Sequence, residues 1–302
     1  MNRQAYADLD DVRYPRPGRA RGSDHLLSEG VYSTLRWRRA RILPRRRRPT
    51  FRRGAMGRVT VQFLGSGDAF GSGGRFQTCF LVRSEPARFL IDCGASSLIA
   101  MKRFGVDPGE LDMILVSHLH GDHFAGVPFV VIEQDVLVKR TRPLVVAGPP
   151  GTMQRVIEAM EVMFPESSRI QRKFPLEIVE LEPERRLALG ALTVTPYLVQ
   201  HPCGAPPLAL RIECDGRVIA YSGDTVWTAS LIDAARAADL FIAEAYTSQP
   251  KSRIHMDLAT LVTHLGEISA KRLILTHMSA EMLARSGSLP YECAEDGKSV
   301  EI

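Results

Sequence analysis

The chain has 302 residues, 45% of them hydrophobic, and a formal net charge of +5 at pH 7. This length and apolar share allow a large buried core and exclude a wholly disordered chain. No run approaches the roughly 18 consecutive apolar residues that a membrane span needs. We therefore expect a folded protein with no membrane partner.

The charge is distributed unevenly. Residues 1–55 hold 15 arginines, no lysine and five acidic residues, whereas the remainder holds 24 basic and 29 acidic residues. The first segment has few apolar residues, several prolines and no helical or strand period, which is typical of disorder. We predict that residues 1–55 form an arginine-rich, disordered N-terminal extension and that residues 56–302 form the folded domain.

The extension has three possible interpretations. Arginine clusters such as Arg45–Arg48 can neutralise nucleic-acid phosphates, so an RNA-binding arm is one of them. A solvated tail is the second. We favour the third, an upstream translation from a misassigned start, because Met56 stands directly before the first expected strand.

Strands and helices interleave along the remaining chain. Apolar and alternating runs predict strands at 59–64, 78–83, 88–92, 113–117, 143–147, 176–180, 192–199, 208–214, 217–221, 240–243 and 272–276. Helical periodicity predicts helices at 95–104, 123–135, 152–163, 230–238 and 257–269, and we expect Thr152 to cap the third. This order indicates a layered α/β fold.

A cluster of metal-ligand residues follows the apolar strand at 113–117. The six residues from His118 to His123 contain His118, His120, Asp122 and His123, and so three of the eight histidines in the chain. Imidazole and carboxylate donors suit zinc, and also manganese, iron or nickel. We expect Gly121 to let this loop bend so that several side chains reach one point.

Three more residues of ligand type follow predicted strands. These are His201, Asp224 and His277. Strand ends on one edge of a layered α/β fold are where active-site residues gather. We therefore expect these side chains to meet the first cluster.

The segment from His118 to His123 has the H-x-H-x-D-H pattern, and in this the chain resembles the metallo-β-lactamase-fold hydrolases. Four further segments occur in that family's order: Val59–Gly67, His201, Tyr221–Thr225 and Leu273–His277. The resemblance covers about residues 57–302. It implies an α/β fold of the family's kind, a four-layer αβ/βα sandwich.

The resemblance also implies a ligand set for two divalent ions. It assigns His118, His120 and His201 to one ion, Asp122, His123 and His277 to the second, and Asp224 to a bridge between them. We expect zinc in both positions, with Mn²⁺, Fe²⁺ or Ni²⁺ as alternatives. Two such ions would activate a water and stabilise the charge of a displacement transition state, so we expect a hydrolase.

The branch within this family is narrowed by a few residues. Asp224 argues against the lactam-cleaving branch, which generally lacks the bridging aspartate, and the surroundings of His201 differ from those of the glyoxalase-type thioester hydrolases. The likeness to the ribonuclease Z-like phosphodiesterases is closer, because Glu244 and His255 match a glutamate and a histidine of that branch. We predict Asp122, His255 and Glu244 as catalytic residues, with His255 as general acid and Glu244 orienting or charging it.

The chain departs from ribonuclease Z proper in one respect. Only 22 residues separate His201 from Asp224, so the tRNA-gripping arm that ribonuclease Z carries there cannot fit. We expect a small phosphodiester or nucleotide as substrate and keep RNA as an alternative. A thioester, lactone or lactam hydrolase and a non-catalytic metal or nucleic-acid binding module are the other functions left open.

Two further expectations concern the cellular compartment and the oligomeric state. The five cysteines are an odd number without C-x-x-C spacing, which favours a reducing compartment, and we expect a cytoplasmic protein. A homodimer is left open.

Overall fold

The structure is a computed structural model that describes residues 35–37 and 58–302. The rest of the predicted extension lies outside the described residues, so its disorder stays a prediction. Leu35–Trp37 differs from that prediction, because it forms a short strand, β1. β1 pairs with a neighbouring strand. Such pairing uses backbone groups, so the amino-acid composition of the segment does not reveal it.

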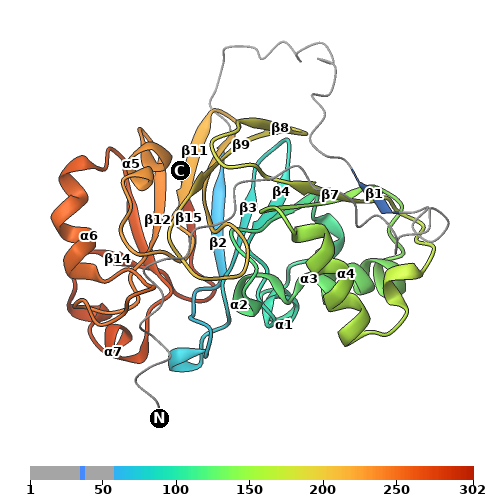
Figure 1. Ribbon diagram of the computed structural model, residues 1–302, viewed down its shortest axis with the longest axis horizontal. Coiled ribbons are helices and arrows are strands. Elements are labelled where there is room, and N and C mark those ends of the chain that lie inside the picture. Colours follow the sequence, from blue (N-terminus) through green and yellow to red (C-terminus); the bar gives the residue numbers. More distant parts are fainter. Residues whose placement is uncertain (1–34, 38–57) are drawn as a thin grey trace, which may run out of the picture. The chain divides into compact units, whose positions relative to one another are not determined.

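Two mixed sheets form the centre of the fold (Figure 1). The first sheet has the order β1-β7-β6-β5-β4-β3-β2-β15. Its strands are β1 (Leu35–Trp37), β2 (Thr60–Gly65), β3 (Cys79–Arg83), β4 (Arg88–Ile91), β5 (Met113–Leu115), β6 (Leu144–Gly148), β7 (Leu176–Glu180) and β15 (Ser299–Glu301).

The second sheet has the order β14-β13-β12-β11-β10-β9-β8. Its strands are β8 (Leu187–Leu189), β9 (Leu192–Leu198), β10 (Leu208–Cys214), β11 (Arg217–Tyr221), β12 (Leu240–Glu244), β13 (Leu273–Thr276) and β14 (Glu292–Cys293). Each of the eleven predicted strands has a counterpart. The sequence missed β1, β8, β14 and β15, which are too short to show a period.

Helices cover the outer faces of both sheets. They are α1 (Ser97–Arg103), α2 (Gly121–Phe124), α3 (Val127–Glu133), α4 (Thr152–Met163), α5 (Ser230–Ala235), α6 (Leu258–His264) and α7 (Ala280–Leu283). Short turns of other helical types are η3 (Ser72–Gly74), η4 (Pro108–Glu110), the π turn η5 (Gln134–Val138), η6 (Ser167–Arg169), η7 (Leu265–Glu267) and η8 (Ser286–Ser288).

Three apolar clusters define the layers. One cluster joins the facing sides of the two sheets, with Phe63 and Phe80 from the first sheet against Tyr221 from the second. A second cluster packs α1, α3 and α4 on the first sheet, and a third packs α5 and α6 on the second. The order helix, sheet, sheet, helix confirms the predicted four-layer αβ/βα sandwich.

The predicted helix at 123–135 is wrong as a single element. The chain forms α2, breaks, and resumes as α3. The Gly126 amide donates to the Cys93 carbonyl oxygen at 2.8 Å, and a Cβ at Gly126 would lie 2.3 Å from the Gly94 carbonyl oxygen. Pro128 follows and has no amide to continue the earlier helix. This contact is tertiary, so helical periodicity could not reveal it.

Other helix predictions need smaller corrections. The helices predicted at 230–238 and 257–269 end earlier, at Ala235 and His264. Thr152 is the first residue of α4 and not its cap, because its hydroxyl donates to the Pro149 carbonyl oxygen at 2.6 Å. Within residues 35–37 and 58–302, no helix combines the length and apolarity needed to cross a bilayer.

Candidate metal centre

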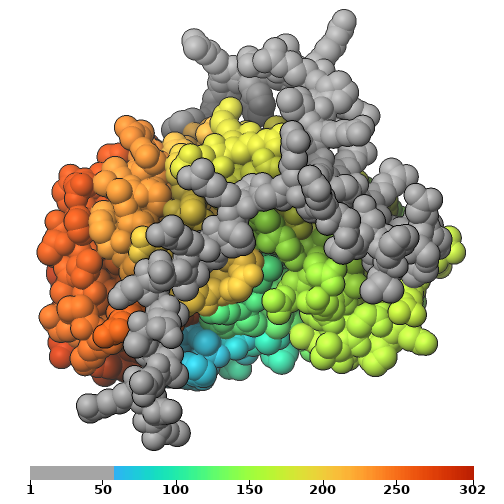
Figure 2. Space-filling view, in the orientation of Figure 1, coloured from blue at the N-terminus to red at the C-terminus, as the bar shows by residue number. Residues whose placement is uncertain are grey.

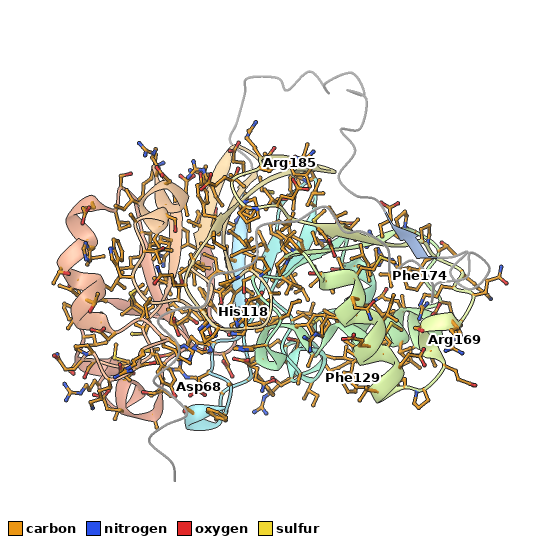
Figure 3. All side chains as sticks on the ribbon, in the orientation of Figure 1. Asp68, His118, Phe129, Arg169, Phe174 and Arg185 are labelled. Atoms are coloured by element: carbon orange, nitrogen blue, oxygen red, sulfur yellow. The ribbon has the colours of Figure 1, made fainter. Side chains whose placement is uncertain are left out.

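The candidate ligands lie where strands of both sheets end. In the first sheet β4, β5 and β6 run parallel, and in the second sheet β11, β12 and β13 do. His118 and His120 follow β5, and His120 precedes α2, which carries Asp122 and His123. His201 follows β9, Asp224 follows β11, and His277 follows β13. Figure 3 shows His118 between the two halves of the sandwich.

Backbone geometry brings Asp224 and His277 to this edge. Gly223 precedes Asp224 with φ +61°, and a Cβ there would lie 2.8 Å from the Leu208 carbonyl oxygen, so only glycine fits the turn. His277 itself has φ 56°, in the left-handed region that only a few per cent of non-glycine residues adopt. By contrast, Gly121 begins α2 and is not among the residues with positive φ. The loop bends because a helix starts there, and the predicted role of Gly121 is not needed.

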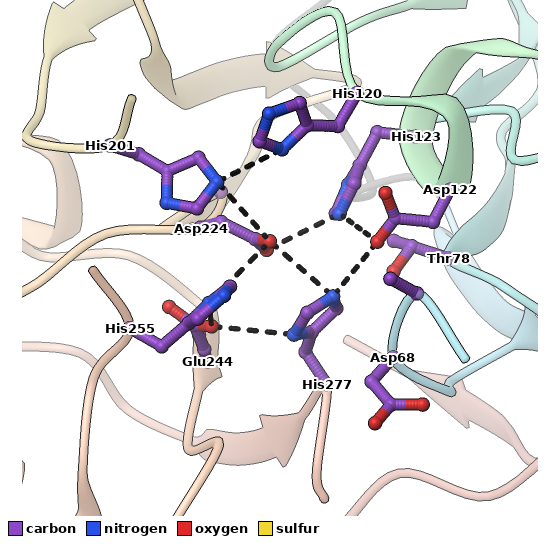
Figure 4. Close-up of polar contacts among 12 residues, drawn as sticks. Asp68, Thr78, His120, Asp122, His123, His201, Asp224, Glu244, His255 and His277 are labelled. Atoms are coloured by element: carbon purple, nitrogen blue, oxygen red, sulfur yellow. Dashed lines mark hydrogen bonds and ion pairs between the residues drawn. The ribbon is translucent and has the colours of Figure 1, made fainter. Parts of the chain in front are cut away.

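The possible ligand atoms form three overlapping groups, and two of them contain the seven predicted ligands, while the third joins Asp224 and His277 to Glu244 and His255. Figure 4 shows most of these residues around Asp224. Of the first two groups, one comprises His118, His120 and His201, and the other comprises Asp122, His123, Asp224 and His277; the ligand atoms within each lie no more than 4.8 Å apart. Asp224 faces both groups. Its Oδ2 is 3.9 Å from Nε2 of His118 and 3.9 Å from Nε2 of His201, and its Oδ1 is 3.3 Å from Nε2 of His123.

Several buried polar atoms of this cluster have no hydrogen-bond partner. Three of them are Nε2 of His118, Nε2 of His123 and Oδ1 of Asp224, of which the last two contact each other only as an ion pair at 3.3 Å. A buried polar atom without a partner costs about 1–3 kcal/mol, so such atoms are normally paired with protein, water or an ion. All three face the centre of the cluster, and the donor set suits a divalent metal.

Hydrogen bonds to the second ring nitrogen fix how the His123 and His201 imidazoles point. Nδ1 of His123 lies 2.7 Å from Asp92 Oδ2, and Nδ1 of His201 lies 2.8 Å from the Ile254 carbonyl oxygen. Both leave Nε2 facing the cluster. His120 differs, because its Nδ1 is the atom that lies 3.1 Å from His201 Nε2.

Asp92 is a site residue that the sequence reasoning missed. It is fully buried after β4, and its carboxylate accepts hydrogen bonds from Ser117 N at 2.7 Å and Ser117 Oγ at 2.8 Å in addition to His123 Nδ1. Its signal was present, because it follows an apolar strand directly, as His277 does. Carboxylates that hold a ligating imidazole in this way are a common feature of metal sites.

Glu244 and His255 also lie at this edge. Nδ1 of His255 lies 2.5 Å from Glu244 Oε1, and Nδ1 of His277 lies 3.3 Å from the same oxygen. Glu244 is fully buried, and its Oε2 accepts from the backbone amides of Thr225 at 2.8 Å and Met256 at 3.2 Å. Glu244 therefore holds two imidazoles in place while its own carboxylate is fixed by backbone donors.

Burial and charge move the pKa values of the cluster in opposite directions. Burial lowers the pKa of His118 well below its usual value, and the charge on His123 adds to that effect. Burial also disfavours protonated His277, but Asp224 and hydrogen bonds to Asp122 and Glu244 outweigh it and raise the pKa of His277 to about 10. For His255, burial is likewise outweighed by the hydrogen bond and charge of Glu244, which raise its pKa.

A cavity of about 450 Å³ opens onto the cluster. It is lined by Ala69, Phe70, His120, Gly121, Asp122, His201, Asp224, Tyr246, Ile254, His255 and His277. The predicted catalytic residues Asp122 and His255 therefore face the cavity, while Glu244 lies behind them. Phe70 and Tyr246 are cavity residues that the sequence reasoning did not identify, since a single aromatic residue in a loop carries no pattern.

This sandwich and its cluster of histidines and aspartates define a metal-dependent hydrolase of the metallo-β-lactamase fold, and comparison with known proteins agrees. A family model described as "Anti-Pycsar protein Apyc1" matches residues 59–291. The chain belongs to this family.

Related proteins and solved structures support the ribonuclease Z-like assignment. Ribonuclease Z of Agathobacter rectalis is 22% identical over 304 residues, which cover 81% of this chain and 98% of that protein. The short form of human tRNase Z is 25% identical with a TM-score of 0.66, over 80% of this chain and 98% of that one. The metallo-β-lactamase fold protein YhfI from Bacillus subtilis is 22% identical with a TM-score of 0.66, over 82% and 100%. The predicted fold and family resemblance are confirmed.

Proposed function

We propose that the protein is a dinuclear metal-dependent phosphodiesterase that acts on small phosphodiesters, including nucleotides. The observation that carries this proposal is the pair of adjacent ligand groups with Asp224 facing both. Named relatives such as ribonuclease Z favour a phosphodiester over other esters.

The ligands divide between two ions in this proposal. His118, His120 and His201 would hold the first, Asp122, His123 and His277 would hold the second, and Asp224, which faces both groups, would be shared between them. We expect zinc, because imidazole and carboxylate donors suit it, and Mn²⁺, Fe²⁺ or Ni²⁺ can occupy similar sites. Such ions, when bound, supply an acidified water and neutralise the charge that builds on a phosphate.

Protein groups carry out the proton transfer to the leaving group. His255 lines the cavity with Nδ1 held by Glu244, so Nε2 is the nitrogen available to a substrate. The raised pKa of His255 favours the protonated ring that a general acid needs. We propose that His255 donates this proton to the departing oxygen and that Glu244 keeps the ring oriented and charged. Asp122, which lines the cavity and belongs to the second ligand group, is the third catalytic residue in this proposal.

We propose a small substrate and not long structured RNA. The connection between His201 and Asp224 is mostly the hairpin of β10 and β11, whose turn is Asp215-Gly216. No protruding arm is present in this described stretch, and the cavity of about 450 Å³ suits a nucleotide-sized molecule. RNA remains the second candidate, since relatives are ribonucleases.

One assay tests this function against its alternatives. Metal-loaded protein is given a phosphodiester, a thioester and a lactam chromogen at equal concentration. We expect turnover of the phosphodiester above all. Preferred turnover of the thioester or lactam would assign the chain to another activity of the same fold, and no turnover with metal bound would indicate a binding module. Asp224→Ala is the matched variant, and it should lose the activity.

Three other proposals concern the domain boundary, the cellular location and the oligomeric state. We propose a domain boundary near Met56 and a cytoplasmic location. A homodimer is a proposal supported by exposed apolar side chains on the face formed by η5 and the chain after η6, which Asp135 and Arg172 join, with Leu137 at 70% and Ile170 at 50% exposure. Sedimentation of the wild type and of Leu137→Glu tests it, because a dimer through this face should become monomeric in the variant.

A further inference from the structure

Phe70 is the most exposed large apolar side chain of residues 58–302. It is 89% exposed and lies in the segment between β2 and η3, yet it lines the cavity over the metal cluster. Figure 2 shows this segment, at the blue end of the folded domain's colour range, at the lower edge of the molecule. An exposed aromatic ring on a cavity rim is typical of a binding surface and not of a core.

The segment that carries Phe70 is held in place by its own hydrogen bonds. Asp68 is buried, and its carboxylate accepts from Ser72 N at 2.8 Å and Ser72 Oγ at 2.7 Å. Ala69 accepts at its carbonyl oxygen from the Gln77 side chain at 3.0 Å, and the Gly71 amide donates to the Asp68 carbonyl oxygen at 3.2 Å. Phe70 is therefore exposed on a fixed loop, which lowers the entropy cost of binding to it.

The lining of the cavity changes character from its base to its rim. Its base consists of the imidazoles and carboxylates of the metal cluster, whereas Ala69, Phe70 and Ile254 are apolar. Tyr246 also lines it, but its ring packs on His255 with centroids 4.6 Å apart. In the part of the chain that the structure describes, Phe70 has no such aromatic partner, so its ring is available to a ligand.

We propose that Phe70 is the stacking platform for the planar base of a nucleotide phosphodiester whose phosphate lies at the metal cluster. This rests on the proposed phosphodiesterase function and names the substrate feature that the rim selects. Stacking of a base on an aromatic ring is sequence-tolerant, because every base has a π face. Phe70 would therefore favour base-bearing substrates without choosing strongly among bases.

The test compares two substrates with the same leaving group. One is the methyl ester of adenosine 5′-monophosphate, and the other is the methyl ester of ribose 5-phosphate, which lacks the base. Removal of a stacking ring corresponds to about 5- to 150-fold in affinity. Phe70→Ala should raise KM for the adenosine ester by about this factor with little change in kcat, and Phe70→Trp should keep KM near the wild-type value.

The controls separate base recognition from general damage. Neither Phe70 variant should change KM for the abasic ester. Val162→Ala truncates an 81% exposed side chain of α4 that does not line the cavity. This variant should change KM for neither ester. The proposal would be overturned if Phe70→Ala raised KM equally for both esters, or changed KM for neither.

Failure of the proposed function is distinguishable from failure of this inference. If wild-type protein cleaves neither ester, the phosphodiesterase assignment fails. Calorimetric titration of the metal-loaded protein with adenosine 5′-monophosphate then decides the role of Phe70. Weaker binding by Phe70→Ala than by wild type supports the platform, and equal binding or no binding by wild type overturns it.

Discussion

Replacement of Asp92 by asparagine should weaken metal binding although Asp92 is not itself a proposed ligand. One carboxylate oxygen accepts from Ser117 N at 2.7 Å, and the other accepts from Ser117 Oγ at 2.8 Å and faces His123 Nδ1 at 2.7 Å. In Asp92→Asn the amide oxygen must stay opposite Ser117 N. The amide NH₂ then faces His123 Nδ1, so the His123 ring must lose its Nδ1 proton and carry it on Nε2.

That change of tautomer removes the lone pair that His123 would offer to the second ion. Loss of an orienting partner of a ligating histidine typically costs 10–100-fold in metal affinity, which is about 1.4–2.7 kcal/mol. Backbone strain does not contribute, because Asp92 has φ 58° and asparagine tolerates this region as aspartate does. The substitution therefore isolates the hydrogen bond.

Competition titrations with a chelator of known affinity, together with elemental analysis of dialysed protein, measure this effect. We expect the Asp92→Asn protein to lose one equivalent of metal before the other. Asp239→Asn is the matched control, since Asp239 is a largely buried carboxylate that accepts from Val218 N at 2.8 Å far from the ligand groups. Unchanged affinity and stoichiometry in Asp92→Asn would refute the claim that Asp92 sets the His123 tautomer.

Four further predictions follow from the same site and chain. Wild-type protein should hold about two metal equivalents, and Asp224→Ala should lose more than one because both groups use it; retention of two by elemental analysis would exclude the bridge. His255→Ala should slow an alkyl phosphodiester about 10²–10⁴-fold but an activated aryl ester much less, with metal content unchanged; equal losses would exclude the general acid. A chain starting at Met56 should keep the melting temperature, metal content and turnover of the full chain; a large loss would show that the preceding residues pack on the domain. Metal uptake at pH 7 should release protons, because the pKa of His277 is raised to about 10 while a ligating imidazole must be neutral; affinity should therefore rise with pH, and calorimetry in buffers of different ionisation enthalpy that detects no proton release would contradict this.

The strands were predictable because their residues are buried on both faces or alternate between core and surface. The run 272–276 became β13, Leu273–Thr276, and 240–243 became β12, Leu240–Glu244. Boundaries of helices were less predictable. The break at Gly126 depends on a contact with the chain after β4, and no local pattern encodes which segment will lie against a glycine.

The same distinction holds for the candidate site. The seven predicted ligand residues do lie together at one edge of the sandwich, because each follows a strand and strand ends share an edge. Their roles as ligands stay predictions. Asp92 follows a strand in the same way, but its role depends on which imidazole lies opposite, and that is decided by the register of β4 on β5.

Division of the candidate ligands between the two sheets has an energetic consequence. The segment after β5 brings His118, His120, Asp122 and His123, while the second sheet brings His201, Asp224 and His277. Two buried carboxylates and several nitrogens without a hydrogen-bond partner lie where the two sheets meet. Pairing of imidazolium with carboxylate offsets only part of the free-energy cost of burying these groups. Ions bound there would join both sheets through ligands far apart in sequence. Their binding energy would therefore also stabilise the packing of one half of the sandwich on the other.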